Sequence, residues 1–220
     1  MIQLHYAPST AAMAPHILLE ELGVPFEKIL VDTARGAHRT EAYKKLNPNS
    51  TVPVLVDGDL VLYESAAIGL HLCDTHPAAG LAPAPGTSER AHFYKWLMWL
   101  TNTLQATLLV YFYPERWVSE GDAAAAAALK AHTEIKVGSL LDQLDTELAR
   151  LEAMQGTPWL LGEKFSAVDA FALVLCRWTR NFGSSPARDR PHLGPYLQRV
   201  LARPAVARVF AAEGLAQPWV

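Results

Sequence analysis

The stretch from Asn47 to Ser65, NPNSTVPVLVDGDLVLYES, carries residue types that could bind a ligand. Pro53 stands inside an apolar strand pattern, where proline removes a backbone donor and marks a strand start or a strand edge. The residue before a proline is held extended, and a cis peptide bond, which is nearly confined to proline, would suit this geometry. Val52 could then offer its N–H and C=O groups to an extended peptide, which would bind as an added strand.

An acid–serine pair follows the same apolar run. Glu64 and Ser65 come after residues 57–59, Asp-Gly-Asp, which turn the chain back. Ser65 would lie at a helix N-terminus, where unpaired backbone N–H groups bind a carboxylate. Together with Val52, this pair predicts a site that binds a small peptide.

Composition limits the classes of partner. The chain has 220 residues, half of them hydrophobic, and a formal net charge of −3. It is long enough to bury a sizeable core, and its near-neutral charge argues against nucleic acid or an anionic membrane as a main partner. The start MIQLHYAP has no basic segment, and no apolar run reaches the roughly 18 residues of a membrane span, so we expect a cytoplasmic protein.

The two cysteines, Cys73 and Cys176, form no Cys-x-x-Cys motif, and no histidines or cysteines recur at metal-ligand spacing. We therefore expect neither a redox motif nor a metal site. Both cysteines fall in helical patterns and are expected to be small buried hydrophobic residues. His16 is expected to be a packing residue or a dimer residue.

The first third of the chain alternates strand and helix signals. The expected strands are 2–6, 26–31, 54–56 and 60–62, and the expected helices are 11–22, 39–46 and 64–75. Gly23 would end the first helix as a C′ glycine. The order βαβαββα fits a small α/β domain, which we expect over residues 1–78.

The segment 76–87 contains three prolines and two glycines, and it predicts a linker, which we assign to residues 79–87. Beyond the linker, strand signals fade and apolar residues recur at spacings of three and four. We therefore expect an all-helical domain over residues 88–220. Asp122 would cap a long helix that runs to Met154.

These features together resemble the cytosolic glutathione S-transferase family. The resemblance rests on VPVL at 52–55, on Glu64-Ser65, on the linker, and on WLLGEKFSAVDAF at 159–171, which contains a Ser-x-x-Asp capping box. It covers nearly the whole chain, and the opening at 7–23 is most similar to bacterial members, particularly the beta class. The resemblance implies a thioredoxin-like N-terminal domain, a helical-bundle C-terminal domain and a homodimer.

The resemblance also implies glutathione as a co-substrate, a small hydrophobic electrophile as the second substrate, and no metal. The implied glutathione contacts are Val52 and the cis proline Pro53 at the cysteinyl part, Glu64 and Ser65 at the γ-glutamyl end, and His38 or Arg39 at the glycyl carboxylate. The electrophile pocket would draw on Met13 and on Tyr111, Tyr113 and Trp117; for the three aromatic residues, packing in the core is an alternative.

The residue that activates the thiol departs from the beta-class pattern. Beta-class relatives carry a cysteine in the loop before the first helix, and counting back from Gly23 puts that position at Ala11. The serine of theta-like and zeta-like classes, counted in the same way, falls on Ser9. We therefore expect Ser9 first, Thr10 second and Tyr6, at the end of the first strand, third. Either hydroxyl of the loop could instead only cap the helix.

We expect a glutathione S-transferase that activates the glutathione thiol for attack on a hydrophobic electrophile. The alternative enzyme is a glutathione-dependent isomerase or dehalogenase of the zeta or theta kind, although the loop PSTAA lacks the SSCS-like pattern of those relatives. The alternative from another class is a non-catalytic member that binds glutathione or a partner, because the loop cysteine is absent.

Overall fold

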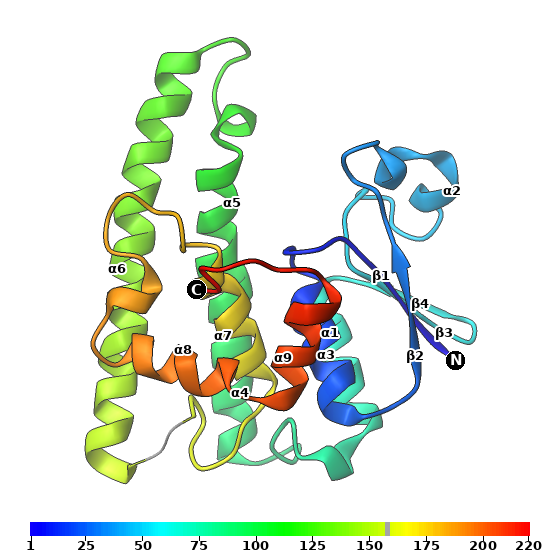
Figure 1. The fold of residues 1–220 in the computed structure, drawn as a ribbon, viewed down its shortest axis with the longest axis vertical. Helices are drawn as coiled ribbons and strands as arrows, with labels where there is room; N and C mark the ends of the chain where they lie inside the picture. The colour runs from blue at the N-terminus through cyan, green and yellow to red at the C-terminus, as the bar shows by residue number, and fades with distance from the viewer. Residues whose placement is uncertain (157–158) are drawn as a thin grey trace. The chain divides into compact units, whose positions relative to one another are not determined.

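The structure, a computed structural model, describes residues 1–156 and 159–220, and these residues pack as two compact units (Figure 1). The first unit contains residues 1–90 and 201–216, and the second contains residues 91–200 and 217–220. The segment 201–216, which the sequence pattern assigns to the helical domain, therefore packs with the first unit. The predicted domain boundaries themselves stay a prediction.

A four-stranded sheet forms the centre of the first unit. Its strands are β1 (Ile2–Tyr6), β2 (Phe26–Leu30), β3 (Val54–Asp57) and β4 (Leu60–Tyr63), in the order β2-β1-β3-β4. Strand β1 is parallel to β2 and antiparallel to β3, which pairs antiparallel with β4. Side chains alternate across a strand, and Ile2, Leu4 and Tyr6 are buried, as the pattern predicts.

Helices cover both faces of this sheet. Figure 1 shows α1 (Met13–Leu22) and α3 (Ser65–Thr75) side by side on one face, and α2 (Glu41–Lys44) on the other. The helix α1 ends at Gly23, which has a φ of 65°, as predicted for a C′ glycine. It begins at Met13 and not at residue 11, because the backbone of Ser9 is left-handed with a φ of 61° and the chain makes a turn first.

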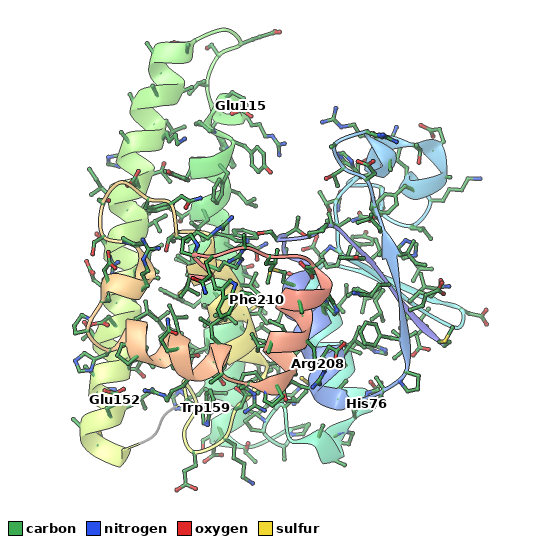
Figure 2. The ribbon with its side chains drawn as sticks, viewed as in Figure 1. His76, Glu115, Glu152, Trp159, Arg208 and Phe210 are labelled. Carbon is green, nitrogen blue, oxygen red and sulfur yellow. The ribbon has the colours of Figure 1, made fainter. Side chains whose placement is uncertain are left out.

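The helix α9 (Pro204–Ala212) packs against α1 within the first unit. Arg203 makes an ion pair of 2.6 Å with Glu21, and Arg208, labelled in Figure 2, extends to the carboxylate of Glu20 at 2.6 Å. Both acidic partners lie on α1. Side-chain contacts between distant segments therefore draw α9 to the first unit, and the helical pattern of its sequence carries no sign of them.

The rest of the described chain is helical, as predicted. The elements are α4 (Ser88–Met98), a π-helical turn (Trp99–Gln105), α5 (Ala106–Phe112), α6 (Ala123–Gln155), α7 (Ala167–Arg177) and α8 (Leu193–Leu201), with short 3₁₀ turns at 37–39, 77–79, 114–117 and 187–189. Asp122 caps α6 by accepting a hydrogen bond of 2.9 Å from the N–H of Ala125, as expected. No helix in the described ranges is long and apolar enough to cross a membrane.

The buried carboxylate of Asp169 organises the core of the second unit. The predicted capping box with Ser166 is present, and Asp169 Oδ2 accepts the Ser166 N–H at 2.8 Å. Asp169 Oδ1 also accepts the N–H of Leu160 at 2.9 Å and the hydroxyl of Tyr196 at 2.6 Å. One side chain thus ties the start of α7 to α8 and to the segment before α7.

Candidate functional site

The peptide bond between Val52 and Pro53 is cis, as the sequence predicts. Pro53 directly precedes β3, so the missing N–H costs the sheet no ladder hydrogen bond. Neither the N–H nor the C=O of Val52 makes a hydrogen bond within residues 1–156 and 159–220. A backbone donor and acceptor beside a strand end can pair with an added extended peptide.

Two buried side chains hold the loop in front of Val52. Asn47 Nδ2 donates to the carbonyl oxygen of Thr51 at 2.9 Å, and its Oδ1 accepts the N–H of Asn49 at 3.0 Å. The hydroxyl of Tyr43 donates to the same Thr51 oxygen at 2.9 Å. The carbonyl immediately before Val52 is therefore fixed from two sides, which sets the direction of the peptide plane that Val52 offers.

Glu64 and Ser65 lie at the N-terminus of α3. Glu64 has a φ of 73°, outside the helical region, so the helix begins at Ser65 and not at Glu64. Neither the carboxylate of Glu64 nor the hydroxyl of Ser65 is hydrogen-bonded to any described residue. A free hydroxyl and the first N–H groups of an eleven-residue helix form a setting that suits a carboxylate.

His38 and Arg39 lie in a 3₁₀ turn before α2. His38 Nδ1 is buried and has no hydrogen-bond partner among the described residues. The guanidinium of Arg39 is exposed and forms no ion pair within the same ranges. The structure thus leaves two nitrogen groups of this turn unpaired, and their role at a ligand carboxylate stays a prediction.

The loop between β1 and α1 holds two hydroxyls in different states. The Oγ1 of Thr10 donates to the carbonyl oxygen of Ala7 at 2.7 Å and accepts the N–H of Ala12 at 3.3 Å. The hydroxyl of Ser9 makes no hydrogen bond to a described residue, and only its backbone N–H is used. The Thr10 hydroxyl therefore already donates its one proton to a backbone carbonyl, whereas the Ser9 hydroxyl can donate its proton to a ligand.

The backbone of Ser9 is strained. Its φ of 61° is left-handed, which is uncommon for a residue other than glycine and costs on the order of 1 kcal/mol or more. Its N–H donates to Glu213 Oε2 at 2.9 Å. Such a conformation persists only when neighbouring contacts impose it, and this hydrogen bond is one such contact.

Tyr6, the third candidate, is buried at the end of β1. Its ring lies 6.0 Å from that of His16, and its hydroxyl makes no hydrogen bond with the described part of the chain. Burial, reinforced by the carboxylate of Glu213, raises the pKa of Tyr6 above its ordinary value. The phenol therefore stays protonated at neutral pH, where it could donate a hydrogen bond but would not act as a base.

Comparison with known proteins identifies the family. Residues 8–75 match the family model of the glutathione S-transferase N-terminal domain, and residues 100–204 match that of the C-terminal domain. Glutathione S-transferase 3 of Zea mays is 32% identical over 91% of this chain and 89% of its own length. The chain belongs to the glutathione S-transferase family.

Solved structures of the family support the bacterial resemblance. A sphingomonad glutathione S-transferase complexed with glutathione is 33% identical, with a TM-score of 0.80, and the match covers 97% of this chain and all of that one. A beta-class glutathione S-transferase of Sphingomonas chungbukensis is 30% identical, with a TM-score of 0.81 and the same coverage. The predicted fold, a thioredoxin-like domain followed by a helical domain, is confirmed.

The residues predicted for the electrophile pocket differ in their exposure. Met13, in the first unit, is fully buried. Tyr111 is buried with its ring centroid 4.3 Å from that of Phe182, which is the packing alternative. Tyr113 and Trp117 are 40% and 64% exposed. The two exposed rings remain the stronger of the four predictions, because an exposed side chain can contact a ligand.

Sequence reasoning missed the side chains that support the loops of the site. Asn47 and Tyr43 hold the loop before Val52, and Glu213 holds the loop of Ser9. Glu213 also pairs with His16, which was expected only to pack or to contact a second subunit. The contact from Asn47 to Thr51 could have been predicted, because the two residues are close in the sequence. The contact between Glu213 and Ser9 could not, because 204 positions separate them and no sequence motif links them.

Among residues 1–156 and 159–220, no group of three or more His, Cys, Asp and Glu side chains is arranged to hold a metal ion. The groups that the loops offer are backbone amides, hydroxyls and a helix N-terminus. Groups of these kinds can bind a peptide with free carboxylates and can donate a hydrogen bond to a thiolate.

Proposed function

We propose that this member of the family conjugates glutathione to a small hydrophobic electrophile, and that the hydroxyl of Ser9 activates the glutathione thiol. The free hydroxyl of Ser9, next to the committed hydroxyl of Thr10, is the observation that carries the proposal. A hydrogen bond to a thiolate stabilises the charged form and lowers the pKa of the thiol.

The proposed binding mode uses the unpaired groups of the first unit. Val52 pairs its backbone with the cysteinyl part of glutathione, and Glu64 and Ser65 hold the γ-glutamyl end through its ammonium and carboxylate. His38 or Arg39 contacts the glycyl carboxylate. The free N–H and C=O of Val52 and the unpartnered hydroxyl of Ser65 support these assignments.

The proposed reaction is a nucleophilic displacement or addition. The thiol loses its proton to solvent, and the thiolate sulfur, which is the nucleophile, forms a bond to an electrophilic carbon. In a displacement, the leaving group departs with the bonding electron pair. A free thiol with a pKa near 8.5 is only about 3% ionised at pH 7, and lowering that pKa by about two units corresponds to roughly 2.7 kcal/mol.

The proposal includes a cytoplasmic homodimer, as the family resemblance implies. Two buried cysteines that form no disulfide are consistent with a reducing compartment. The proposal leaves two alternatives to the test: a glutathione-dependent isomerase or dehalogenase, and a member that binds glutathione without turnover.

Steady-state conjugation of glutathione to a chloronitroaromatic compound tests the proposal. Ser9→Ala should lower kcat at least tenfold with a small change in the KM for glutathione, because the hydroxyl acts on the thiolate. Ser65→Ala should mainly raise that KM. Glutathione binding without turnover of this compound or of haloalkanes would favour a binding protein, and an absence of glutathione binding would reject the transferase assignment.

A further inference from the structure

A buried carboxylate from the C-terminal part of the chain supports the loop that carries Ser9. Glu213 directly follows α9, and its side chain is fully buried. Its Oε2 accepts the backbone N–H of Ser9 at 2.9 Å, and its Oε1 pairs with His16 Nδ1 at 2.8 Å. Both carboxylate oxygens therefore have a partner, as a buried carboxylate requires.

The ring of His16 is held in one orientation. It is fully buried on α1, and its centroid lies 6.0 Å from that of Tyr6 and 5.7 Å from that of Phe26. The contact with Glu213 Oε1 uses Nδ1, and Nε2 is buried without a hydrogen-bond partner in the described ranges. A histidine fixed in this way fixes the carboxylate, and the second carboxylate oxygen is then aimed at the loop.

The hydrogen bond from the Ser9 N–H is made by a residue whose backbone is strained. Ser9 has a φ of 61°, and its N–H direction is set by the peptide plane that precedes it. The bond to Glu213 is one of the contacts that hold Ser9 at this φ, and a relaxation of φ with the N–H plane fixed would turn the Cβ and the hydroxyl of Ser9. The position of the hydroxyl is thus coupled to the bond between Ser9 and Glu213.

We propose that Glu213 is a positioning residue, which acts through the backbone of Ser9 to hold the serine hydroxyl where it can donate to the glutathione sulfur. This inference rests on the proposed function, because Glu213 acts only through Ser9 and makes no contact with the ligand itself. His16 supports Glu213, and the carboxylate reaches the loop because α9 packs against α1, as Figure 1 shows for the two helices. The C-terminal segment 201–216 is thereby part of the thiol-activating machinery.

A purely structural role for Glu213 is the competing explanation. The pair with His16 could serve only to join the end of α9 to α1, in parallel with the ion pairs of Arg203 and Arg208. In that case the loss of Glu213 would lower stability and leave the bound thiol unchanged. The pKa of the bound glutathione thiol separates the two roles, because it reports on the hydrogen bond to sulfur.

The test variant is Glu213→Leu, which is of similar size and removes both the charge and the acceptor of the Ser9 N–H, whereas the amide oxygen of a glutamine could still accept that N–H. Removal of a negative charge would by itself lower the pKa of a nearby thiol, whereas loss of the hydrogen bond from Ser9 would raise it. We expect a rise of about one unit, which is a tenfold loss of thiolate well below the pKa, with a less than threefold change in glutathione affinity. The matched control is Arg208→Ala, which removes an exposed α9–α1 ion pair outside this cluster and should leave the thiol pKa unchanged.

The measurement is the ultraviolet absorbance of the bound thiolate as a function of pH, together with calorimetry for glutathione affinity. An unchanged or lowered thiol pKa in Glu213→Leu would overturn the inference while the proposed function stands. An ordinary thiol pKa in the wild-type complex would overturn both. If Glu213→Leu does not fold, Glu213→Asp replaces it, because the shorter side chain withdraws the carboxylate from the Ser9 N–H: a raised thiol pKa supports the inference, and a thiol pKa equal to that of the wild type counts against it.

Discussion

At the scale of single residues, adjacent hydroxyls of one loop differ in their hydrogen bonds. Ser9 leaves its hydroxyl free and uses its backbone N–H, whereas Thr10 uses its hydroxyl to hold the turn. A hydroxyl that already donates at 2.7 Å to a carbonyl would have to give up that bond to reach a thiolate. The structure thus gives a physical reason to prefer Ser9. The count back from Gly23 also selects Ser9, but a shift of one residue in that count would select Thr10.

The contrast predicts opposite effects for the two substitutions. Thr10→Val should lower the free energy of unfolding by about 1 kcal/mol, because it removes two local hydrogen bonds, and should leave the bound-thiol pKa close to that of the wild type. Ser9→Ala should raise the bound-thiol pKa with a smaller effect on stability. Urea unfolding and thiolate absorbance measure the two quantities, and a raised thiol pKa in Thr10→Val would transfer the activating role to Thr10.

The two cysteines should be inert towards thiol reagents. Burial raises the pKa of Cys73 and of Cys176 to about 12, and both are free and buried. Because the thiolate is the reactive form, native protein should react with a colorimetric disulfide reagent only as it unfolds, and both thiols should react in denaturant. Rapid modification of the native protein would show that a cysteine is more accessible than the structure describes.

At the scale of elements, the loop before β3 is held by the side chains of Asn47 and Tyr43. The Tyr43 hydroxyl donates to Thr51, and burial raises its pKa to about 12. Since the folded-state pKa lies above the unfolded value of 10.0, the tyrosine contributes stability below pH 10 and loses it as the pH rises towards 12.

Tyr43→Phe should therefore lower the free energy of unfolding by about 1 kcal/mol at neutral pH. The variant removes one of the two hydrogen bonds to the Thr51 oxygen and leaves the one from Asn47. The difference between wild type and variant should shrink from about pH 10 upwards. Glutathione affinity should fall as well, since this loop presents Val52. Urea titrations at neutral and alkaline pH test the first two points, and a constant difference across that range would contradict the raised pKa of Tyr43.

The capping box of α7 is predicted to matter for folding and not for chemistry. Asp169 is fully buried and accepts hydrogen bonds from Leu160, Ser166 and Tyr196. Asp169→Ala would leave these donors unpaired, and we expect a loss of roughly 3 kcal/mol or more. At a low temperature at which Asp169→Ala remains folded, its KM for glutathione should equal that of the wild type. A changed KM together with wild-type stability would contradict this prediction.

Much of the secondary structure was predictable, because its signals are local. The limits of β1, the end of α1 at Gly23 and the cap at Asp122 follow from alternation, a C′ glycine and a side-chain acceptor. The π-helical turn at Trp99–Gln105 was not predictable, since its apolar residues recur at spacings that an α-helix also gives. The helix around residues 39–46 is shorter than expected and breaks into a 3₁₀ turn and α2, because Thr40 is extended and caps the second piece.

At the scale of the whole molecule, segments that are distant in the sequence complete the first unit. The loop of Ser9, the cis proline, the start of α3 and the segment 201–216 all belong to it. The sequence predicts the first three because each carries its own motif. It does not predict the fourth, because neither His16 in α1 nor Glu213 just after α9 belongs to a motif, and the two residues pair across 197 positions.

This organisation predicts where glutathione should protect the backbone. The bound ligand should slow amide hydrogen exchange in the loops of the first unit, and the effect should extend to residues 201–216 through Glu213. At a glutathione concentration of 100 times Kd, binding to the native state should add about 2.7 kcal/mol of stability. Protection confined to residues 1–90 would contradict a functional role for the C-terminal segment, and cysteinylglycine, which lacks the γ-glutamyl group, serves as the control.

The most direct test of the account is the pH titration of glutathione bound to the wild type and to Ser9→Ala, followed by thiolate absorbance. We predict a bound-thiol pKa about two units below the free value of roughly 8.5 in the wild type and a return towards that value in Ser9→Ala. A thiol pKa that is lowered equally in both proteins would contradict the role of Ser9 and direct attention to Tyr6, and a thiol pKa that is not lowered in either would contradict thiol activation by this protein.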